Sequence, residues 1–118
     1  MAINLIRRGD IYLTHFGLAR EGEVALIHPS VIITANVANA NLDVLVVIPL
    51  TSNIERLFLH DLLLPLERTG LNKDSKAQVN LIRHVSTTRF SKRLGFVPDD
   101  LMIELDEKII EHLGLRYR

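Results

Sequence analysis

The chain has 118 residues, of which 47% are hydrophobic, and its 14 acidic side chains balance its 14 lysines and arginines. This length predicts a single domain over residues 1–118, and the balanced charge gives no sign of a nucleic-acid partner. The lack of cysteine excludes disulfides, thiolate metal sites and cysteine nucleophiles and fits a cytoplasmic protein, while the longest apolar run, residues 44–50, is too short to cross a membrane.

The first half of the chain predicts strands joined by polar turns. Residues 9–16 (GDIYLTHF) are rich in strand formers behind a glycine, and they predict a first strand. Residues 17–28 are turn-rich and too long for a tight hairpin, so they are a candidate functional loop. Residues 30–35 and 44–50 are apolar runs rich in valine and isoleucine, which predicts strands buried on both faces. The three asparagines of residues 36–41 favour a polar turn between these strands.

The second half predicts further strands and a closing helix. Strands are expected over residues 60–66 and 92–97, with one or two strands over 76–85 and a turn over 67–74. Residues 98–114 predict a helix with two aspartates at its start and a glycine at its end. The apolar stripe of this helix recurs every four residues, at Leu101, Leu105, Ile109 and Leu113. The expected fold is therefore α+β and mainly β, a small barrel-like curled sheet with a C-terminal α-helix.

The charges are unevenly distributed although they balance overall. No acid lies between Ser75 and Pro98, whereas residues 99–111 carry six acids and a single lysine. The basic side chains of the acid-free stretch are Lys76, Arg83, Arg89, Lys92 and Arg93. This stretch allows a local anion-binding face on a neutral protein, but the two stretches could equally neutralise each other on a solvated surface.

The histidines do not predict a metal site. They are His15, His28, His60, His84 and His112. None of them forms the closely spaced pair that is typical of zinc-binding motifs, so we expect neither a metal nor another cofactor. The sequence also lacks a glycine-rich phosphate loop and a serine-nucleophile elbow.

Polar residues at strand ends are the remaining candidates for chemistry. His28 and Pro29 open the second predicted strand, and residues 51–53 close the third. If these strands are antiparallel neighbours, His28 and Thr51 lie on the same rim. A histidine, a threonine hydroxyl and the Glu23 carboxylate can together transfer protons and hold a phosphate. The alternative is a solvated loop histidine beside an ordinary turn.

A series of short motifs resembles the MazF/PemK family, the toxins of type II toxin–antitoxin pairs. In chain order the motifs are RGDIY, HPSVIIT, VVIPLTS, GLNKDSKAQVNLIR and TTRFSKRLGFV, followed by an acidic helix. The resemblance runs from Arg8 to Leu115, which is nearly the whole chain. It implies an SH3-like β-barrel homodimer that cleaves single-stranded mRNA at short sequence motifs without a metal. It also implies a partner, a small antitoxin with a flexible acidic tail.

The resemblance further implies a reaction and a set of site residues. The 2′-hydroxyl next to the cleaved bond attacks phosphorus and leaves a cyclic phosphate, which requires proton transfer and charge stabilisation. Thr51 matches the family's threonine and Glu23 matches its loop glutamate, so the expected catalytic residues are these two and His28. The residues expected to contact RNA are Pro29, Ser52, Asn53, Arg83 and Arg89.

Three positions depart from the family pattern. His28 stands where the family usually has an arginine, and Val24 and Leu81 stand where it usually has glutamines. Arginine is a permanent bidentate cation, whereas histidine has fewer donors but exchanges protons near neutral pH. We therefore expect His28 to act as a general acid or base, with Arg83 or Arg89 stabilising charge. The competing interpretation is a weakened or altered toxin.

Two other functional classes remain open. One is a non-catalytic toxin of the same fold that acts by binding a protein such as DNA gyrase, and the other is a structural β-barrel adapter.

The four phenylalanines are expected in the core, which leaves RNA recognition to polar loop groups. They are Phe16, Phe58, Phe90 and Phe96.

Overall fold

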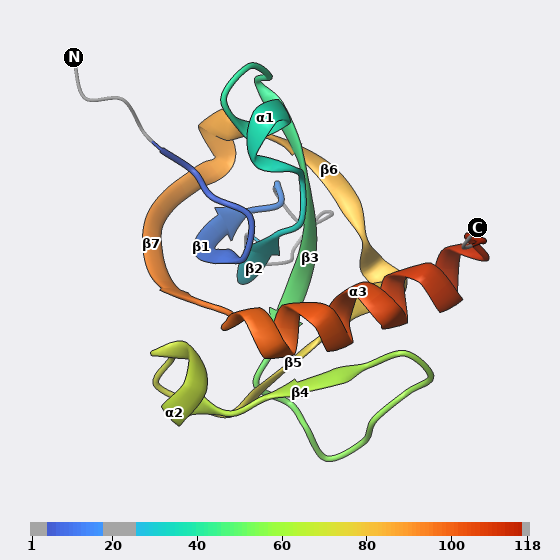
Figure 1. Ribbon diagram of the computed structural model, residues 1–118. Helices are drawn as coiled ribbons and strands as arrows, with labels where there is room; N and C mark the ends of the chain where they lie inside the picture. Colours follow the sequence, from blue (N-terminus) through green and yellow to red (C-terminus); the bar gives the residue numbers. More distant parts are fainter. Residues whose placement is uncertain (1–4, 18–25, 117–118) are drawn as a thin grey trace.

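In the part of the chain that the structure describes, seven antiparallel strands curl into one sheet, and a C-terminal helix covers its open side (Figure 1). The computed structural model describes residues 5–17 and 26–116. The elements are β1 (Asp10–His15), β2 (Ile27–Ile32), α1 (Asn36–Asn39), β3 (Val44–Thr51), β4 (Leu62–Leu64), α2 (Leu66–Thr69), β5 (Ser75–Ala77), the 3₁₀ turn η1 (Val79–Leu81), β6 (Arg83–Ser86), the 3₁₀ turn η2 (Thr87–Arg89), β7 (Phe90–Phe96) and α3 (Asp99–Leu113). The predicted fold class, mainly β with a C-terminal helix, is confirmed.

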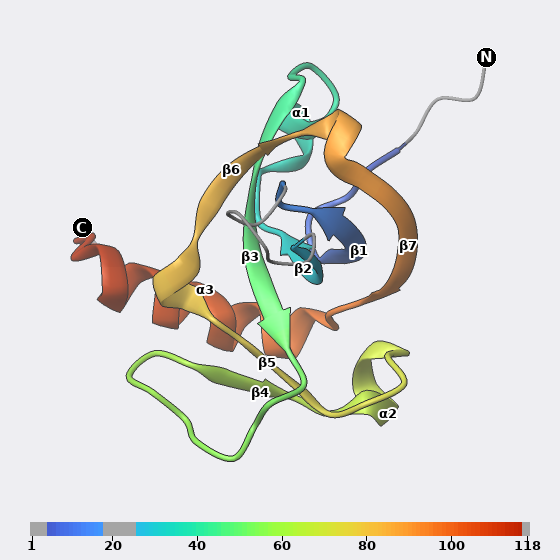
Figure 2. The ribbon, with the colours of Figure 1, turned by 180° about the vertical axis from the view of Figure 1, so that it is seen from behind.

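The long strand β3 joins the two halves of the sheet (Figure 2). The sheet order is β4-β5-β3-β2-β1-β7, and β6 also pairs with β3. Residues 44–47 of β3 pair with β6, whereas Leu50 and Thr51 pair with β5. Pro49 lies between these two pairings, where the strand changes partner and a residue without an N–H is tolerated. The change of partner carries the end of β3 out of the first half of the sheet and into the second.

Both faces of β3 are buried, as its near-continuous apolar run predicts. On one face Ile48 and Leu50 pack in a core cluster with Leu105 of α3. On the other face Leu45 and Val47 pack in a second cluster that is closed by partly buried aromatic side chains of β1 and β7. The alternation of a strand sends neighbouring side chains to opposite faces, so one strand supplies both clusters.

Helix α3 confirms most of the predicted apolar stripe. Leu101, Met102 and Leu105 are buried, whereas Leu113 is exposed because the end of the helix extends past the sheet (Figure 1). The Arg68 guanidinium hydrogen-bonds Asp100 in the first turn of the helix and lowers the pKa of that carboxyl. Gly114 adopts a left-handed φ of 67° and ends the helix, as predicted. No helix in the described ranges is both long and apolar enough to cross a membrane.

The predicted turns contain short helices, and one strand is shorter than predicted. Residues 36–41 include the single-turn helix α1, and residues 67–74 begin within α2. Helix α2 is set between Pro65, whose fixed φ suits a helix entry, and Gly70 with a left-handed φ of 82°. The predicted strand over residues 60–66 shortens to β4.

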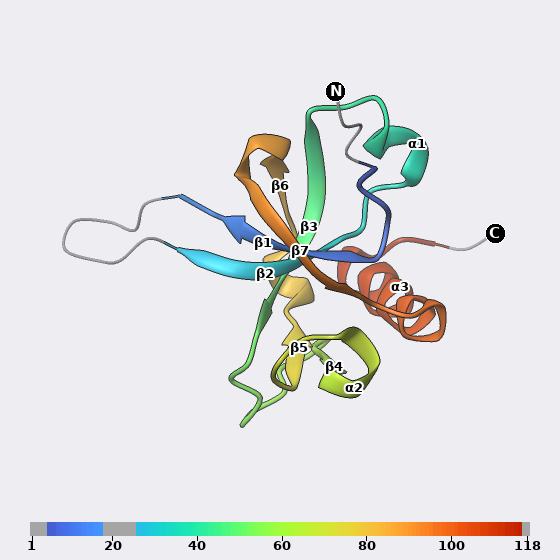
Figure 3. The same ribbon diagram turned by 90° about the vertical axis from the view of Figure 1, so that its left-hand side faces the viewer.

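The end of the predicted loop, residues 26–28, pairs with β1, so the β1–β2 pairing begins earlier in the chain than predicted. The Phe16 N–H donates to the Leu26 carbonyl, and the Leu26 N–H donates to Gly17, so the β1–β2 pairing extends beyond the two strands. His28 pairs with Thr14 and Pro29 with Leu13. These two strands project from the sheet on the side away from α3 (Figure 3). Residues 18–25 of the predicted loop lie outside the described residues.

Gly95 in β7 marks a close contact with α2 that a single methyl group would break. A Cβ built on Gly95 would lie 2.0 Å from the Thr69 carbonyl oxygen. We expect Gly95→Ala to lower the free energy of unfolding by about 1–3 kcal/mol, because the backbone of β7 or α2 must move to accept it. Urea denaturation followed by circular dichroism measures the change. Lys92→Ala, at an exposed position of the same strand, is the control, and equal midpoints for the two variants would contradict the prediction.

Candidate functional site

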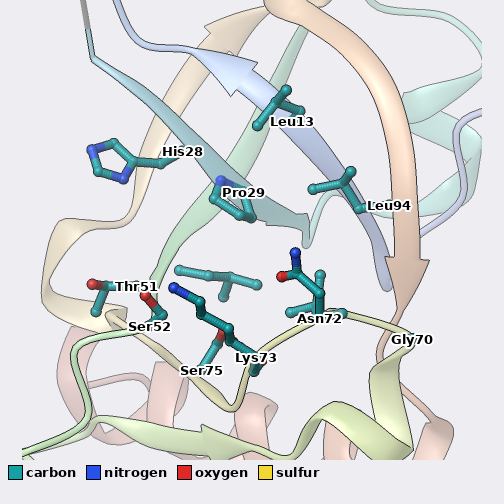
Figure 4. A pocket seen from close by; sticks show the side chains of 12 residues that line it. Leu13, His28, Pro29, Thr51, Ser52, Gly70, Asn72, Lys73, Ser75 and Leu94 are labelled. Carbon is teal, nitrogen blue, oxygen red and sulfur yellow. The ribbon is translucent and has the colours of Figure 1, made fainter. Parts of the chain in front are cut away.

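A wide hollow opens where β2 and β3 separate (Figure 4). We call it the main hollow. His28 and Pro29 of β2 lie along one side, and Thr51 at the end of β3 lies below them. The segment between α2 and β5 forms the facing wall. The polar side chains that line the main hollow are His28, Thr51, Ser52, Asn72, Lys73 and Ser75.

The sheet register explains why His28 and Thr51 meet in this hollow. β2 and β3 are antiparallel, with Ser30 opposite Pro49, so continuing the register would place His28 opposite Thr51. The described ladder ends at Ser30 and Pro49, and Pro29 is the next residue on β2. Neither proline can donate the hydrogen bonds that would continue the ladder. The strands therefore part, and the space between them becomes the main hollow. The expected antiparallel neighbours and their shared rim are confirmed.

A second, smaller cavity lies on the other side of His28. We call it the Phe16 pocket, and it is lined by Phe16, Leu26, His28, Pro49, Gln78, Leu81 and Arg83. The Arg83 guanidinium lies 5.1 Å from the centre of the Phe16 ring, a cation–π distance. The ring of His28 is tilted against the same Phe16 ring, with centroids 6.4 Å apart. His28 is thus the shared wall of the two cavities, and Arg83 is close to it.

A third cavity, the Phe58 pocket, adjoins Thr51 and is lined by Thr51, Asn53, Glu55, Arg56, Phe58, Lys76 and Gln78. The Thr51 hydroxyl accepts a hydrogen bond from the Asn53 N–H at 3.2 Å, which holds the turn after β3. Ser52 faces the main hollow, whereas Asn53 faces this pocket. The residues that close the third predicted strand therefore divide between two neighbouring cavities.

Lys76 does not belong to an anion-binding face, which corrects one interpretation of the basic stretch. Its ammonium group lies 2.9 Å from the Asp61 carboxylate, and both side chains are buried. It also donates to the Arg56 carbonyl at 2.6 Å and lies over the Phe58 ring. This lysine is committed to an internal ion pair, and Lys73 is the lysine that lines the main hollow.

One expected site residue among those that the structure describes, Arg89, lines none of these three cavities. Arg89 lies in η2, which follows β6, and the last residue of β6, Ser86, pairs with the first residue of β3, whereas Thr51 is the last residue of β3. Glu23 lies outside the described residues. Arg93, from the basic stretch, is paired with Asp10 at 3.2 Å. Of the expected cationic residues, Arg83 is therefore the one placed next to His28.

The phenylalanines were predicted to be buried, and for two of them this is wrong. Phe58 is 56% exposed and Phe96 is 50% exposed. Each of these rings carries a guanidinium against it, from Arg56 and Arg93 respectively. Stacking on a cation lets an aromatic ring remain at the surface, an arrangement that hydrophobicity alone does not predict.

Sequence reasoning missed Gln78, Asn72 and Lys73. Gln78 borders both the Phe16 pocket and the Phe58 pocket. It follows β5 directly, and its N–H donates to the Pro49 carbonyl, which fixes the residue beside β3. Leu81, three residues later, lines the same Phe16 pocket. The Gln78 carboxamide therefore lines the same pocket as Leu81, the residue that stands where the family pattern has a glutamine.

The lining of the main hollow and the Phe16 pocket suits an anion. Among the described residues, no aspartate or glutamate lines either cavity. Lys73 and Arg83 provide positive charge, and Thr51 and Ser52 provide hydroxyl donors. His28, between the two cavities, provides an imidazole, the side chain that most often serves as general acid or base. Within residues 5–17 and 26–116 no three acidic or histidine side chains are grouped in a way that could hold a metal ion.

Comparison with known proteins gives one family. Residues 7–113 match the family described as "PemK-like, MazF-like toxin of type II toxin-antitoxin system". The chain is 34% identical over 116 residues to Endoribonuclease MazF9 of Mycobacterium tuberculosis (strain ATCC 25618 / H37Rv), covering 94% of this chain and 98% of the relative. Solved structures match at lower identity. A chain of a MazE–MazF crystal structure from Deinococcus radiodurans superposes with a TM-score of 0.81 at 17% identity, covering 97% of this chain and 100% of that one. An endoribonuclease from a mycobacterial species, in complex with its cognate antitoxin, superposes with a TM-score of 0.76 at 18% identity, covering 95% and 98%.

Proposed function

Because the chain belongs to the PemK/MazF family of type II toxin–antitoxin toxins, we propose that it is an endoribonuclease that cleaves single-stranded mRNA in the main hollow. The observation that carries the proposal is the shared lining of that hollow. His28 and Thr51 face one open cavity with Lys73, and Arg83 stands on the other side of the histidine. A proton-exchanging group, a hydroxyl and two cations are what cleavage of a phosphodiester by its own 2′-hydroxyl requires.

The proposed reaction transfers a phosphoryl group within the RNA chain. The 2′-oxygen forms a bond to phosphorus and gives up its proton to a base. The bond from phosphorus to the 5′-oxygen of the next nucleotide breaks, and that oxygen receives a proton. The products are a 2′,3′-cyclic phosphate and a free 5′-hydroxyl. Water does not enter this step, and the number of protons is unchanged over the whole step.

Each residue has a separate role in this proposal. His28 exchanges a proton with the attacking or the leaving oxygen, because it is exposed at the rim and lines the hollow. The Thr51 hydroxyl donates to a non-bridging phosphate oxygen. Lys73 and Arg83 stabilise the negative charge that grows on phosphorus. Pro29, Ser52 and Asn53 line the path of the strand, while Glu23 and Arg89 remain predictions from the sequence.

The proposal includes the partners that the family implies. A cognate antitoxin with an acidic tail would cover the cationic lining and exclude RNA, and the mycobacterial endoribonuclease solved with its antitoxin supports such a partner. We further propose a homodimer that acts in the cytoplasm, where mRNA is available. The homodimer and the cytoplasmic location are both inferred from membership of the family.

Cleavage of a long RNA in the presence of EDTA tests the proposal. We expect the purified protein to cut single-stranded RNA and to leave cyclic phosphate and 5′-hydroxyl ends. Thr51→Ala should cut about 10 to 100 times more slowly, because it removes one hydrogen bond to a charged oxygen. Thr51→Ser, which keeps the hydroxyl, is the matched control and should retain most of the activity.

Two results would overturn the proposed activity. One is wild-type protein that leaves every RNA tested intact while it binds a protein other than its antitoxin, which would favour the non-catalytic class of toxin. The other is cleavage with 5′-phosphate ends, since attack by the 2′-hydroxyl cannot produce them.

A further inference from the structure

A pair of histidines lies outside the three cavities, where the connection between β3 and β4 meets helix α3. The Nδ1 atom of His60 lies 3.1 Å from the Nδ1 atom of His112, and the planes of the two imidazoles are close to perpendicular. His60 lies shortly before β4, and His112 lies in the last turn of α3. The two residues are 52 positions apart, so the spacing of histidines along the chain does not reveal this pair.

The two facing nitrogens are separated like two ligands of one metal ion. In a tetrahedral zinc site with bonds of about 2.0–2.1 Å, two ligand nitrogens lie about 3.3 Å apart. The separation of 3.1 Å in this pair is close to that value. Without an ion, one Nδ1–H donates to the other Nδ1. A metal ion between the rings would instead use the lone pairs of both nitrogens.

The other nitrogen of His60 faces the kind of partner that metal-bound histidines usually have. Its Nε2 atom lies 3.5 Å from a carboxylate oxygen of Glu111, the residue before His112 on α3. A histidine that binds a metal through one nitrogen typically donates the N–H of its other nitrogen to a carboxylate, which fixes the orientation of the ring and its tautomer. His60 therefore faces a second imidazole on one side and a carboxylate on the other.

The backbone of His60 is held in an uncommon conformation. Among residues 5–17 and 26–116, His60 is the only residue other than glycine with a positive φ, which is 70°. A residue with a Cβ keeps such a conformation only where the surrounding contacts require it, and functional sites are common places for it. The next residue, Asp61, is fixed by its buried pair with Lys76. The imidazole of His60 is thus held in place and is only 13% exposed.

We propose that His60 and His112 bind one divalent transition-metal ion, such as Zn²⁺, which fastens the connection between β3 and β4 to helix α3. Each imidazole gives its Nδ1 lone pair to the ion and keeps its proton on Nε2. Water completes the coordination, because within the described ranges no group of three acidic or histidine side chains could hold the ion. Imidazole suits Zn²⁺, Cu²⁺ and Ni²⁺, whereas Mg²⁺ prefers oxygen ligands.

The fastened connection carries residues that border two of the cavities. Ser52 lines the main hollow, and Asn53 and Phe58 line the Phe58 pocket. All three precede His60 on the same connection, so an ion at His60 and His112 would restrict the motion of the segment that carries them. The inference concerns metal binding and the order of this segment. It therefore does not depend on the proposed cleavage of RNA.

Isothermal titration calorimetry with zinc chloride tests the site, on protein without a histidine tag and in buffer without a chelator. The wild type should bind one ion per chain. His60→Asn and His112→Ala should each bind it about tenfold more weakly or not at all, because each variant keeps only one of the two ligands. Asparagine tolerates a left-handed φ, so His60→Asn keeps the backbone conformation.

Three controls make this titration specific. His84→Ala removes an exposed histidine of β6 and should bind zinc as the wild type does. Glu111→Gln should bind about tenfold more weakly, because it removes the charge that supports His60, whereas Glu107→Gln, one turn earlier on an exposed position, should not change the affinity. Magnesium chloride should give no binding. Thermal midpoints in EDTA show that each variant is folded, and His112→Ala, at an exposed position, keeps the test available if His60→Asn is unstable.

Electron paramagnetic resonance of the copper-bound protein counts the ligands directly. With one equivalent of Cu²⁺, the wild type should show coupling to two imidazole nitrogens, and His112→Ala should show coupling to one. Wild-type protein that binds no zinc would overturn the inference. Zinc binding that is equally tight after the loss of His112 would also overturn it, since the ion would then lie elsewhere.

Hydrogen exchange followed by mass spectrometry tests whether the ion fastens the connection. Zinc should slow exchange at the amides of residues 52–61 in the wild type and should leave exchange unchanged in His112→Ala. Zinc that binds the wild type without slowing exchange in this segment would contradict the fastening. Neither measurement uses RNA, so a protein that cleaves no RNA could still confirm the metal site, and an active nuclease could still lack it.

Discussion

Replacing His28 by alanine is expected to slow RNA cleavage by about a hundredfold to ten-thousandfold, the usual contribution of a positioned acid or base. The side chain is exposed on β2 and lies between the main hollow and the Phe16 pocket. Its removal takes away the imidazole of these cavities, the side chain that most often serves as general acid or base. The backbone pairing of His28 with Thr14 does not involve the imidazole, so we expect the thermal midpoint to change little.

His28→Arg separates proton transfer from charge stabilisation. Arginine can hold a phosphate through two donors but stays protonated, so it cannot act as a base. If histidine moves a proton in this enzyme, the arginine variant should recover part of the lost rate and lose one limb of the pH–rate profile. The measurement is initial cleavage rate against pH for the wild type and both variants.

Two outcomes would count against a proton-transfer role for His28. The first is an alanine variant that cleaves RNA at the wild-type rate. The second is an arginine variant with the wild-type rate and the wild-type pH profile, which would mean that only charge is needed at this position. His84→Ala, at an exposed histidine of β6 outside these cavities, is the control for nonspecific effects of losing an imidazole.

Much of the fold could be predicted because a strand that is buried on both faces appears in the sequence as a continuous apolar run. The run over residues 44–50 is apolar at successive positions, and β3 contributes to both core clusters. The starts of elements were harder to predict. Residues 26–28 border a polar, turn-rich segment, yet they pair with β1. Local composition does not reveal backbone pairing with a strand that lies about ten residues or more earlier in the chain.

The site was predictable where topology alone determines it. His28 and Thr51 follow from antiparallel neighbours and two strand ends, and both line the main hollow. The sequence could not distinguish Lys73 from Lys76, which lie three residues apart. Lys76 pairs internally with Asp61, fifteen residues earlier, while Lys73 lines the hollow. The tertiary packing of the segment before β4 places Asp61 against Lys76 and so determines which of the two lysines can contact a substrate.

Removing one partner of the buried Lys76–Asp61 pair is expected to destabilise the fold beside the site. Both side chains are almost fully buried, and the second carboxylate contact of Asp61 is the Phe58 N–H at 2.8 Å. Lys76→Met leaves the carboxylate buried without its cation, which should lower the free energy of unfolding by about 3–5 kcal/mol. Because domains of this size are usually stable by only about 5–15 kcal/mol, the variant should be close to unfolding at 37 °C. Urea denaturation followed by circular dichroism measures the loss.

A double variant distinguishes a buried charge from lost packing. In Lys76→Met with Asp61→Asn, the amide oxygen can still accept from the Phe58 N–H, and no charge remains buried, so most of the stability should return. Arg68→Ala removes the exposed pair with Asp100 and serves as the control, with little change in stability expected.

Lys76 is also the partner of Thr51 in the β3–β5 ladder, so the Lys76→Met variant should lose cleavage activity together with stability. A stable, inactive Lys76→Met protein would contradict this explanation, because it would place the lysine in the chemistry and not in the support of Thr51.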